Sequence, residues 1–150
     1  MDRVAHAAEL FVKGYNCAQA VAVAFADRLG LEEKTAARMV SGFGGGFGRL
    51  REVCGAVSGM VFVISSLYGY DDAAATTEKK DTYQLIQALA GQFREKTGSI
   101  VCREILKNPP SDPVPSDRTE AYYAGRPCVR MVYTAAAIVD AYIAAHPMEN

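Results

Sequence analysis

The sequence lacks an excess of charge of either sign. Its 150 residues include 16 Lys and Arg against 17 Asp and Glu, so the formal net charge at pH 7 is −1. Domains that bind nucleic acid usually present a basic face, and acidic interaction tails need a block of like charge. Neither is present in the sequence. We therefore expect no nucleic-acid partner.

Histidine is scarce, and no targeting segment is predicted. The two histidines, His6 and His146, lie near the chain ends, so a Ser/His/Asp arrangement lacks its general base and histidine ligands for a metal are weak candidates. The N-terminal segment is short and mixed in charge, without the apolar core of a signal peptide. The charge-free run 53–70 approaches membrane-spanning length, but glycines and serines interrupt it, which favours a buried helix. These features predict a cytoplasmic protein without membrane insertion.

No alternating strand pattern and no internal repeat of fixed period occurs. Apolar residues recur instead at helical spacing, and the predicted helices cover residues 3–13, 17–30, 32–41, 54–70, 76–97, 100–106 and 128–145. The sequence therefore predicts one all-α domain over residues 1–150, a bundle of five to seven helices around the central apolar helix 54–70. The alanine-rich apolar helices also make a homodimer plausible.

Several helix ends carry local signals. Asn16 and Ser99 are predicted N-caps. The segment 117–120 has the pattern of a capping box, and Pro127 suits a first helical position. The four prolines within 109–115 predict an extended loop, because proline lacks an N–H donor and restrains the preceding residue.

A glycine loop, residues 42–48 (GFGGGFG), precedes the central helix. It is not followed by Gly-Lys-Ser/Thr and no strand precedes it, so a structural loop is favoured over a phosphate-binding motif. Arg49 and Arg51 follow the loop beside a helix start, where they either bind an anion or extend into solvent. The candidate cofactor-binding residues are Gly44, Gly45, Gly46, Arg49 and Arg51.

The four cysteines are the strongest chemical signal. Cys17, Cys54, Cys102 and Cys128 are widely spaced without a CxxC pair, so neither a zinc ribbon nor a thioredoxin motif is indicated. Each follows a helix breaker and falls at a predicted helix N-terminus, where free N–H groups and the helix dipole stabilise a thiolate. All four are candidate catalytic residues and candidate metal ligands. Cys54, close to the two arginines, is the predicted attacking thiolate.

These cysteines also carry a family resemblance. Cys17 in GYNCAQAV, the central motif CGAVSG at 54–59, Cys102 in GSIVCREIL and Cys128 in RPCVRMV resemble the C_GCAxxG_C_C family, over about residues 9–140. The resemblance implies redox activity or metal binding through the four cysteines. It also implies genomic association with transporters or oxidoreductases, so a redox partner or a transporter-associated protein is expected. No substrate follows from it.

Three functions from different classes remain open at this point. In the first, two cysteines cycle between dithiol and disulfide. In the second, the four cysteines bind zinc or an iron–sulfur cluster, the latter accepting dispersed ligands more readily. In the third, the protein is a structural helical domain or binding module, and its cysteines are buried packing residues.

Overall fold

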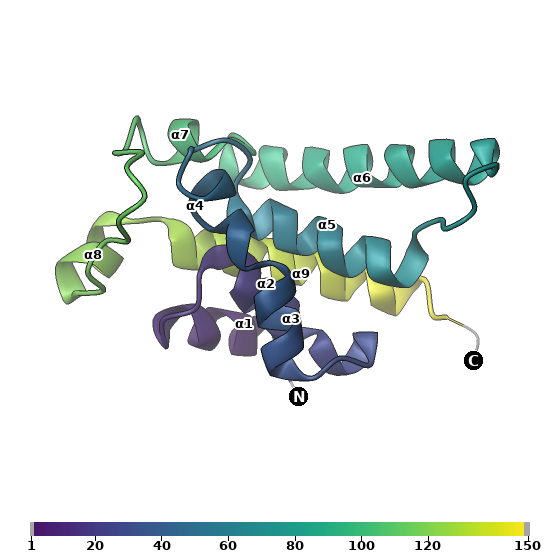
Figure 1. Ribbon diagram of the computed structural model, residues 1–150, viewed down its shortest axis with the longest axis horizontal. Coiled ribbons are helices and arrows are strands. Elements are labelled where there is room, and N and C mark those ends of the chain that lie inside the picture. The colour runs from purple at the N-terminus through teal and green to yellow at the C-terminus, as the bar shows by residue number, and fades with distance from the viewer. Residues whose placement is uncertain (1, 149–150) are drawn as a thin grey trace.

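Helices form the architecture of the described chain. The computed structural model describes residues 2–148. Its α-helices are α1 (Arg3–Val12), α2 (Cys17–Ala24), α3 (Glu33–Met39), α4 (Gly44–Phe47), α5 (Gly55–Tyr68), α6 (Thr76–Thr97), α7 (Cys102–Ile105), α8 (Glu120–Gly125) and α9 (Cys128–Ala145), with 3₁₀ turns η1 (Ala26–Leu29) and η2 (Ser41–Phe43). Within residues 2–148 no strand forms, and the single β-bridge joins Val53 and Val101. The all-α prediction is confirmed (Figure 1).

The described helices outnumber the predicted five to seven because short ones intervene. The longer helices α1, α2, α3, α5, α6 and α9 have 7 to 22 residues each. Helices α4, α7 and α8 have only 4 to 6 residues. Of these, α4 lies inside the predicted glycine loop. It is a tight coil rather than a regular helix, since Gly45 and Gly46 have φ of +67° and +72°.

The first predicted cap is confirmed at the start of α2. The Asn16 side chain accepts a hydrogen bond from the Gln19 N–H, and the Gln19 side chain accepts one from the Asn16 N–H, which forms a capping box. Helix α2 is shorter than predicted, because the chain tightens into η1 after Ala24. The expected stop at Gly30 is present, with φ of +67°.

Two other predicted caps are wrong. Helix α7 begins at Cys102 and not after Ser99, because Val101 is held extended by its bridge to Val53. Helix α8 is capped by Thr119, whose hydroxyl accepts from the Tyr122 N–H, and not by a box that starts at residue 117. Pro127 takes the N-cap position of α9 rather than the first helical position.

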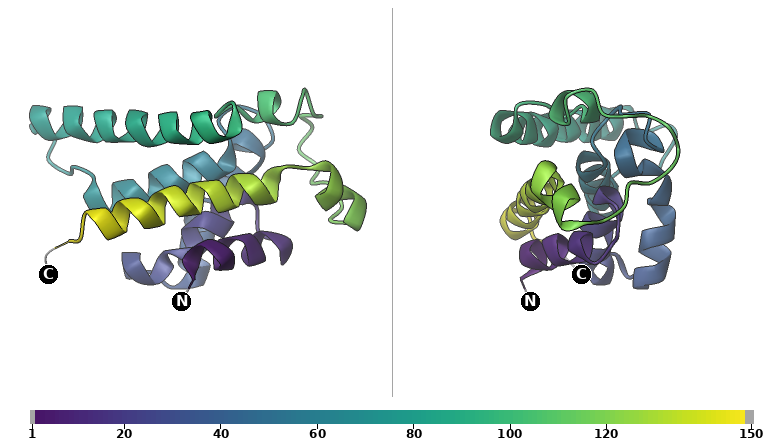
Figure 2. Two further views of the ribbon diagram at one scale, coloured as in Figure 1. Left: turned by 180° about the vertical axis from the view of Figure 1, so that it is seen from behind. Right: turned by 90° about the vertical axis from the view of Figure 1, so that its left-hand side faces the viewer.

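The long helices lie side by side and share one end. Helices α5 and α9 run in the same direction, α6 returns over them, and α1 and α2 pack beneath (Figures 1 and 2). Helix α9 is long and apolar enough to span a membrane by length and composition alone. In this fold it packs against α1, α2, α5 and α6, which is the environment of a core helix. The N-termini of α5, α7 and α9 gather at the end where α4 and α8 lie.

Candidate functional site

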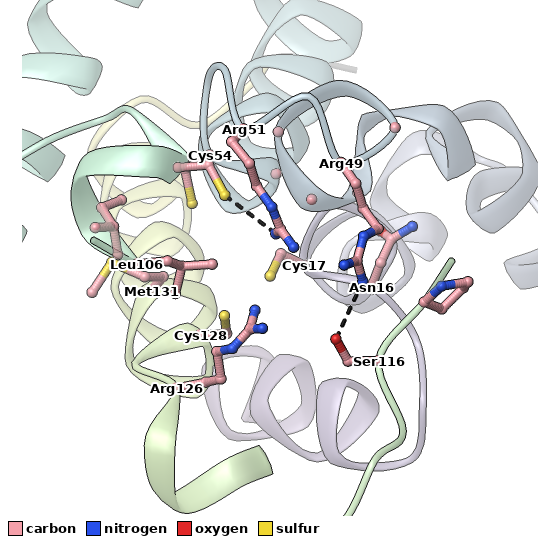
Figure 3. Close-up of a pocket in the computed structure, with 18 of the residues that line it drawn as sticks. Asn16, Cys17, Arg49, Arg51, Cys54, Leu106, Ser116, Arg126, Cys128 and Met131 are labelled. Carbon is pink, nitrogen blue, oxygen red and sulfur yellow. Dashed lines mark hydrogen bonds between the residues drawn. The ribbon is translucent and has the colours of Figure 1, made fainter. Parts of the chain in front are cut away.

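All four cysteines begin helices, as the sequence predicts. Cys17, Cys102 and Cys128 are the first residues of α2, α7 and α9, and Cys54 is the N-cap of α5. The four side chains line one cavity of about 270 Å³ at the shared end of the helices (Figure 3). Cysteines that are 26 or more residues apart in sequence are thereby brought to one space.

A short piece of backbone pairing holds Cys54 and Cys102. Their N–H groups donate to the carbonyls of Ile100 and Glu52, at 2.7 Å and 2.6 Å, on either side of the Val53–Val101 bridge. The bridge therefore aligns the segments that enter α5 and α7, and both thiols reach the same cavity.

Two glycines of the CGAVSG motif bring α2 against α5. A Cβ at Gly55 would lie 3.2 Å from the Cβ of Cys17, and a Cβ at Gly59 would lie 2.8 Å from the Ala18 carbonyl oxygen. Real Cβ atoms do not approach a backbone oxygen so closely, so only glycine permits this helix contact. The motif thus sets the distance between the cysteines at the starts of the two helices.

The glycine loop packs directly on the cysteine segments. Gly46 is buried with φ of +72°, and a Cβ there would lie 2.8 Å from the Cβ of Cys102. A Cβ at Gly44 would collide with the Asn16 side chain, 2.5 Å from its Cγ. The predicted structural role of this loop therefore has a geometric basis. The five candidate cofactor-binding residues, Gly44, Gly45, Gly46, Arg49 and Arg51, all line the cavity as well.

Arg49 and Arg51 are not the solvated side chains that one interpretation expected. Arg51 is only 4% exposed; its Nε donates to the Pro110 carbonyl at 2.9 Å, and its Nη1 contacts the Cys102 Sγ at 3.7 Å. Its Nη2 is buried and has no hydrogen-bond partner among the described residues. Arg49 donates through Nε to the Asp112 carbonyl at 2.8 Å. Both arginines thus hold the proline-rich loop over the cavity.

Two further arginines, Arg118 and Arg126, line the cavity, and the sequence did not predict a role for them. The Arg126 guanidinium lies 5.0 Å from the centre of the Tyr122 ring, and it makes no hydrogen bond or ion pair within residues 2–148. Arg118 is fully engaged, because it donates to the carbonyls of Phe11 and Tyr15 and stacks on aromatic rings. The sequence does carry a signal for Arg126. It lies two residues before Cys128, much as Arg51 lies three residues before Cys54, so an arginine near the cysteine could have been expected at both sites.

The thiols differ strongly in acidity. The adjacent Cys17 thiol lowers the pKa of Cys128 to about 7, because a protonated Cys17 stabilises the Cys128 thiolate; Arg126 adds to this, against the effect of burial. The same contact, with burial, raises the pKa of Cys17 well above its usual value. These two cysteines therefore form an unequal pair that shares one proton.

The other two cysteines remain protonated. Burial raises the pKa of Cys54 to about 12, although the N–H groups of Ala56 and Val57 partly offset it. Burial also raises the pKa of Cys102 despite the contact with Arg51. Cys54, the predicted attacking thiolate, thus ionises less easily than Cys128, because desolvation at the N-cap of the buried helix α5 outweighs the nearby positive charge.

The four cysteines surround the cavity without converging on one point. Within residues 2–148, no group of three or more Cys, His, Asp or Glu side chains is close enough to hold a single metal ion. All four cysteines are free thiols. A tetrahedral zinc site therefore does not fit this arrangement. Among the four, Cys128 and Cys17 combine an easily ionised thiol with a protonated neighbour.

Comparison with known proteins yields one match. A family model described as "Putative redox-active protein (C_GCAxxG_C_C)" matches residues 15–142, which include all four cysteines. No curated protein and no solved structure matches the chain.

Proposed function

The chain belongs to the C_GCAxxG_C_C family, and from this premise we propose that it is a thiol–disulfide redox protein in which Cys128 is the nucleophile and Cys17 the resolving thiol. The observation that carries the proposal is the unequal pair at the starts of α9 and α2. One thiol has a pKa of about 7, and its neighbour, by remaining protonated, stabilises that thiolate. A nucleophile near neutral pKa beside a protonated partner is the arrangement that dithiol exchange needs.

The exchange proceeds in two successive nucleophilic displacements at sulfur. The Cys128 thiolate attacks one sulfur of a disulfide R–S–S–R′, and the bond between the substrate sulfurs breaks. R′S⁻ leaves and takes up the proton from Cys17. The Cys17 thiolate then attacks the Cys128 sulfur of the mixed disulfide, and RS⁻ leaves and takes a proton from solvent. The substrate is reduced to two thiols, and Cys17 and Cys128 are oxidised to a disulfide.

A second partner has to restore the dithiol. The oxidised Cys17–Cys128 pair accepts two electrons from an external dithiol, such as that of a redox protein, by the same exchange in reverse. We propose that this partner acts in a reducing compartment, the cytoplasm, where structural disulfides are uncommon.

Trapping the intermediates tests the proposal. The reduced protein is treated with hydroxyethyl disulfide at pH 7, quenched with iodoacetamide and analysed by peptide mass spectrometry. The expected product is a Cys17–Cys128 disulfide. Cys17→Ser should accumulate the mixed disulfide on Cys128, and Cys128→Ser should abolish both species. Cys54→Ser and Cys102→Ser are matched controls that should retain the wild-type product. A disulfide that excludes Cys128, or a wild-type reaction in Cys128→Ser, contradicts the proposal.

An iron–sulfur protein is a second candidate, favoured by one observation. Four thiols line a single cavity whose other charged groups are arginines, and cysteines dispersed in sequence can ligate a cluster. Cys17, Cys54, Cys102 and Cys128 would be its ligands, and the cluster would supply one-electron transfer. Iron and labile-sulfide analysis of protein purified without oxygen separates the candidates. Stoichiometric iron and sulfide with few free thiols supports the cluster, and four free thiols without metal supports dithiol exchange.

A further inference from the structure

The side chains that line the cavity of the four cysteines carry an excess of positive charge. Four arginines line it, Arg49, Arg51, Arg118 and Arg126, and no Asp or Glu is among its lining residues. Arg49 pairs with Asp112 at 3.9 Å on the side of the proline-rich loop, and a Cys128 thiolate offsets at most one of the other three charges. A buried charge is normally paired, because its removal from water is costly. The imbalance therefore points to a negatively charged occupant.

Arg51 is the centre of this imbalance. Its side chain is 4% exposed, it forms no ion pair within the described residues, and two of its nitrogens are engaged by Pro110 and Cys102. Arg51 lines the cavity, and its remaining nitrogen, Nη2, is buried without a hydrogen-bond partner among the described residues. An orphaned buried donor of a guanidinium is a rare feature, and an anion in the cavity would satisfy it with a charge-assisted hydrogen bond.

Arg126 faces the same space from the opposite side. Figure 3 shows the guanidinium groups of Arg51 and Arg126 reaching toward the cavity, with the Cys17 sulfur between them and the Cys128 sulfur beside Arg126. Arg126 makes no hydrogen bond or ion pair among the described residues, so its donors are available. A planar guanidinium on each side suits an oxyanion or a carboxylate, which accepts two hydrogen bonds from one arginine.

We propose that this cavity is an anion-binding site, in which Arg51 and Arg126 hold the negatively charged group of the disulfide compound that the cysteines reduce. The reduction of a disulfide in this inference rests on the proposed function, whereas the binding of an anion rests on the arginines alone. It narrows the substrate class to small disulfides that carry a carboxylate or another anionic group near the sulfur–sulfur bond. Binding there places the substrate sulfur beside Cys128, which lines the same cavity.

Binding is tested first without any thiol chemistry. Inorganic sulfate is the probe, and the melting temperature is followed against sodium chloride of equal ionic strength. Wild type should show a saturable rise with sulfate. In Arg126→Gln, whose arginine makes no hydrogen bond in the fold, the apparent affinity should fall about 10-fold or more. Arg51→Gln should behave likewise, and exposed Arg94 on α6 provides the matched control Arg94→Gln. An equal response to sulfate in all four proteins overturns the anion site.

Substrate preference is tested with three disulfides of similar size and different charge. Dithiodiglycolate is anionic, hydroxyethyl disulfide is neutral and cystamine is cationic. The reduced protein should react with dithiodiglycolate about 10-fold faster than with hydroxyethyl disulfide, and slowest with cystamine. In Arg126→Gln, the ratio of the rate with dithiodiglycolate to the rate with hydroxyethyl disulfide should approach one. This ratio, unlike a single rate, is unaffected by a change in the thiolate fraction of Cys128.

The two tests separate the two proposals. Equal rates for the three disulfides, each forming the Cys17–Cys128 bond, overturn the anion inference and leave the redox function standing. Sulfate binding that depends on Arg51 and Arg126, with no reaction of any disulfide, overturns the redox function and supports the anion site.

Discussion

The acidity of Cys128 gives the sharpest test of the site. With a pKa of about 7, half of Cys128 is thiolate at pH 7, whereas a thiol at the unperturbed value of 9.0 is about 1% ionised. The ionised fraction therefore favours Cys128 about 50-fold. The intrinsic nucleophilicity of a thiolate falls as its pKa falls, with a Brønsted slope of about 0.4–0.5. Over two pKa units this reduces the advantage of Cys128 by a factor of about 8. Alkylation of Cys128 at pH 7 should then be about sixfold faster than that of an ordinary thiol.

The assay is the rate of iodoacetamide modification of each cysteine between pH 5 and 10, resolved by peptide mass spectrometry. The rate at Cys128 should rise to a plateau with a midpoint near pH 7. In Cys17→Ala the midpoint should move upward, because the adjacent thiol is the largest cause of the lowered pKa. Cys102→Ala is the control and should leave the midpoint nearly unchanged. A midpoint near 9 in wild type, or modification of Cys54 before Cys128, would refute the reasoning.

Three more outcomes follow from the packing and the ionisation. Gly59→Ala should destabilise the fold by about 1–3 kcal/mol in chemical denaturation, since the new Cβ meets the Ala18 carbonyl at 2.8 Å; Gly91→Ala on α6, with open space around it, should be neutral or stabilising. Gly46→Ala should cost at least about 1–2 kcal/mol from its positive φ alone, and an unchanged midpoint would contradict the argument. Because the folded pKa of Cys128 is lowered, its contribution to stability is complete above the unfolded pKa near 9 and is lost as pH falls through 7. The raised pKa values of the other three cysteines act in the opposite direction in both proteins. The free energy of unfolding of wild type should therefore rise by about 2 kcal/mol between pH 7 and 9 relative to that of Cys128→Ser.

The sequence predicted the helices and the positions of the cysteines well, because both depend on local signals. Helix α6 runs from Thr76 to Thr97 as its periodicity indicates, and Asn16 caps α2 as its side chain suggests. The start of α7 was misplaced because a nonlocal contact, the bridge of Val101 to Val53, keeps the preceding residues extended. Pairing between distant segments leaves no trace in a local pattern.

The acidities could not be predicted from the neighbours in sequence. Arg49 and Arg51 closely precede Cys54 in the chain, yet Arg51 contacts the sulfur of Cys102, and burial dominates the pKa of Cys54. Cys128 acquires its low pKa chiefly from Cys17, which is more than one hundred residues away. Desolvation and the identity of the nearest thiol are properties of the packed helices, and only the fold assigns them.

The Arg51 guanidinium links the occupancy of the cavity to the position of the proline-rich loop, because it takes part in both. Through Nε it donates to the Pro110 carbonyl of the proline-rich loop, and its side chain lines the cavity, with Nη2 left without a partner among the described residues. An occupant that fixes this planar group also fixes the orientation of Nε, so occupancy and loop docking favour one another by the same factor. A bound anion would therefore hold the loop over the cavity, and its departure would loosen the loop.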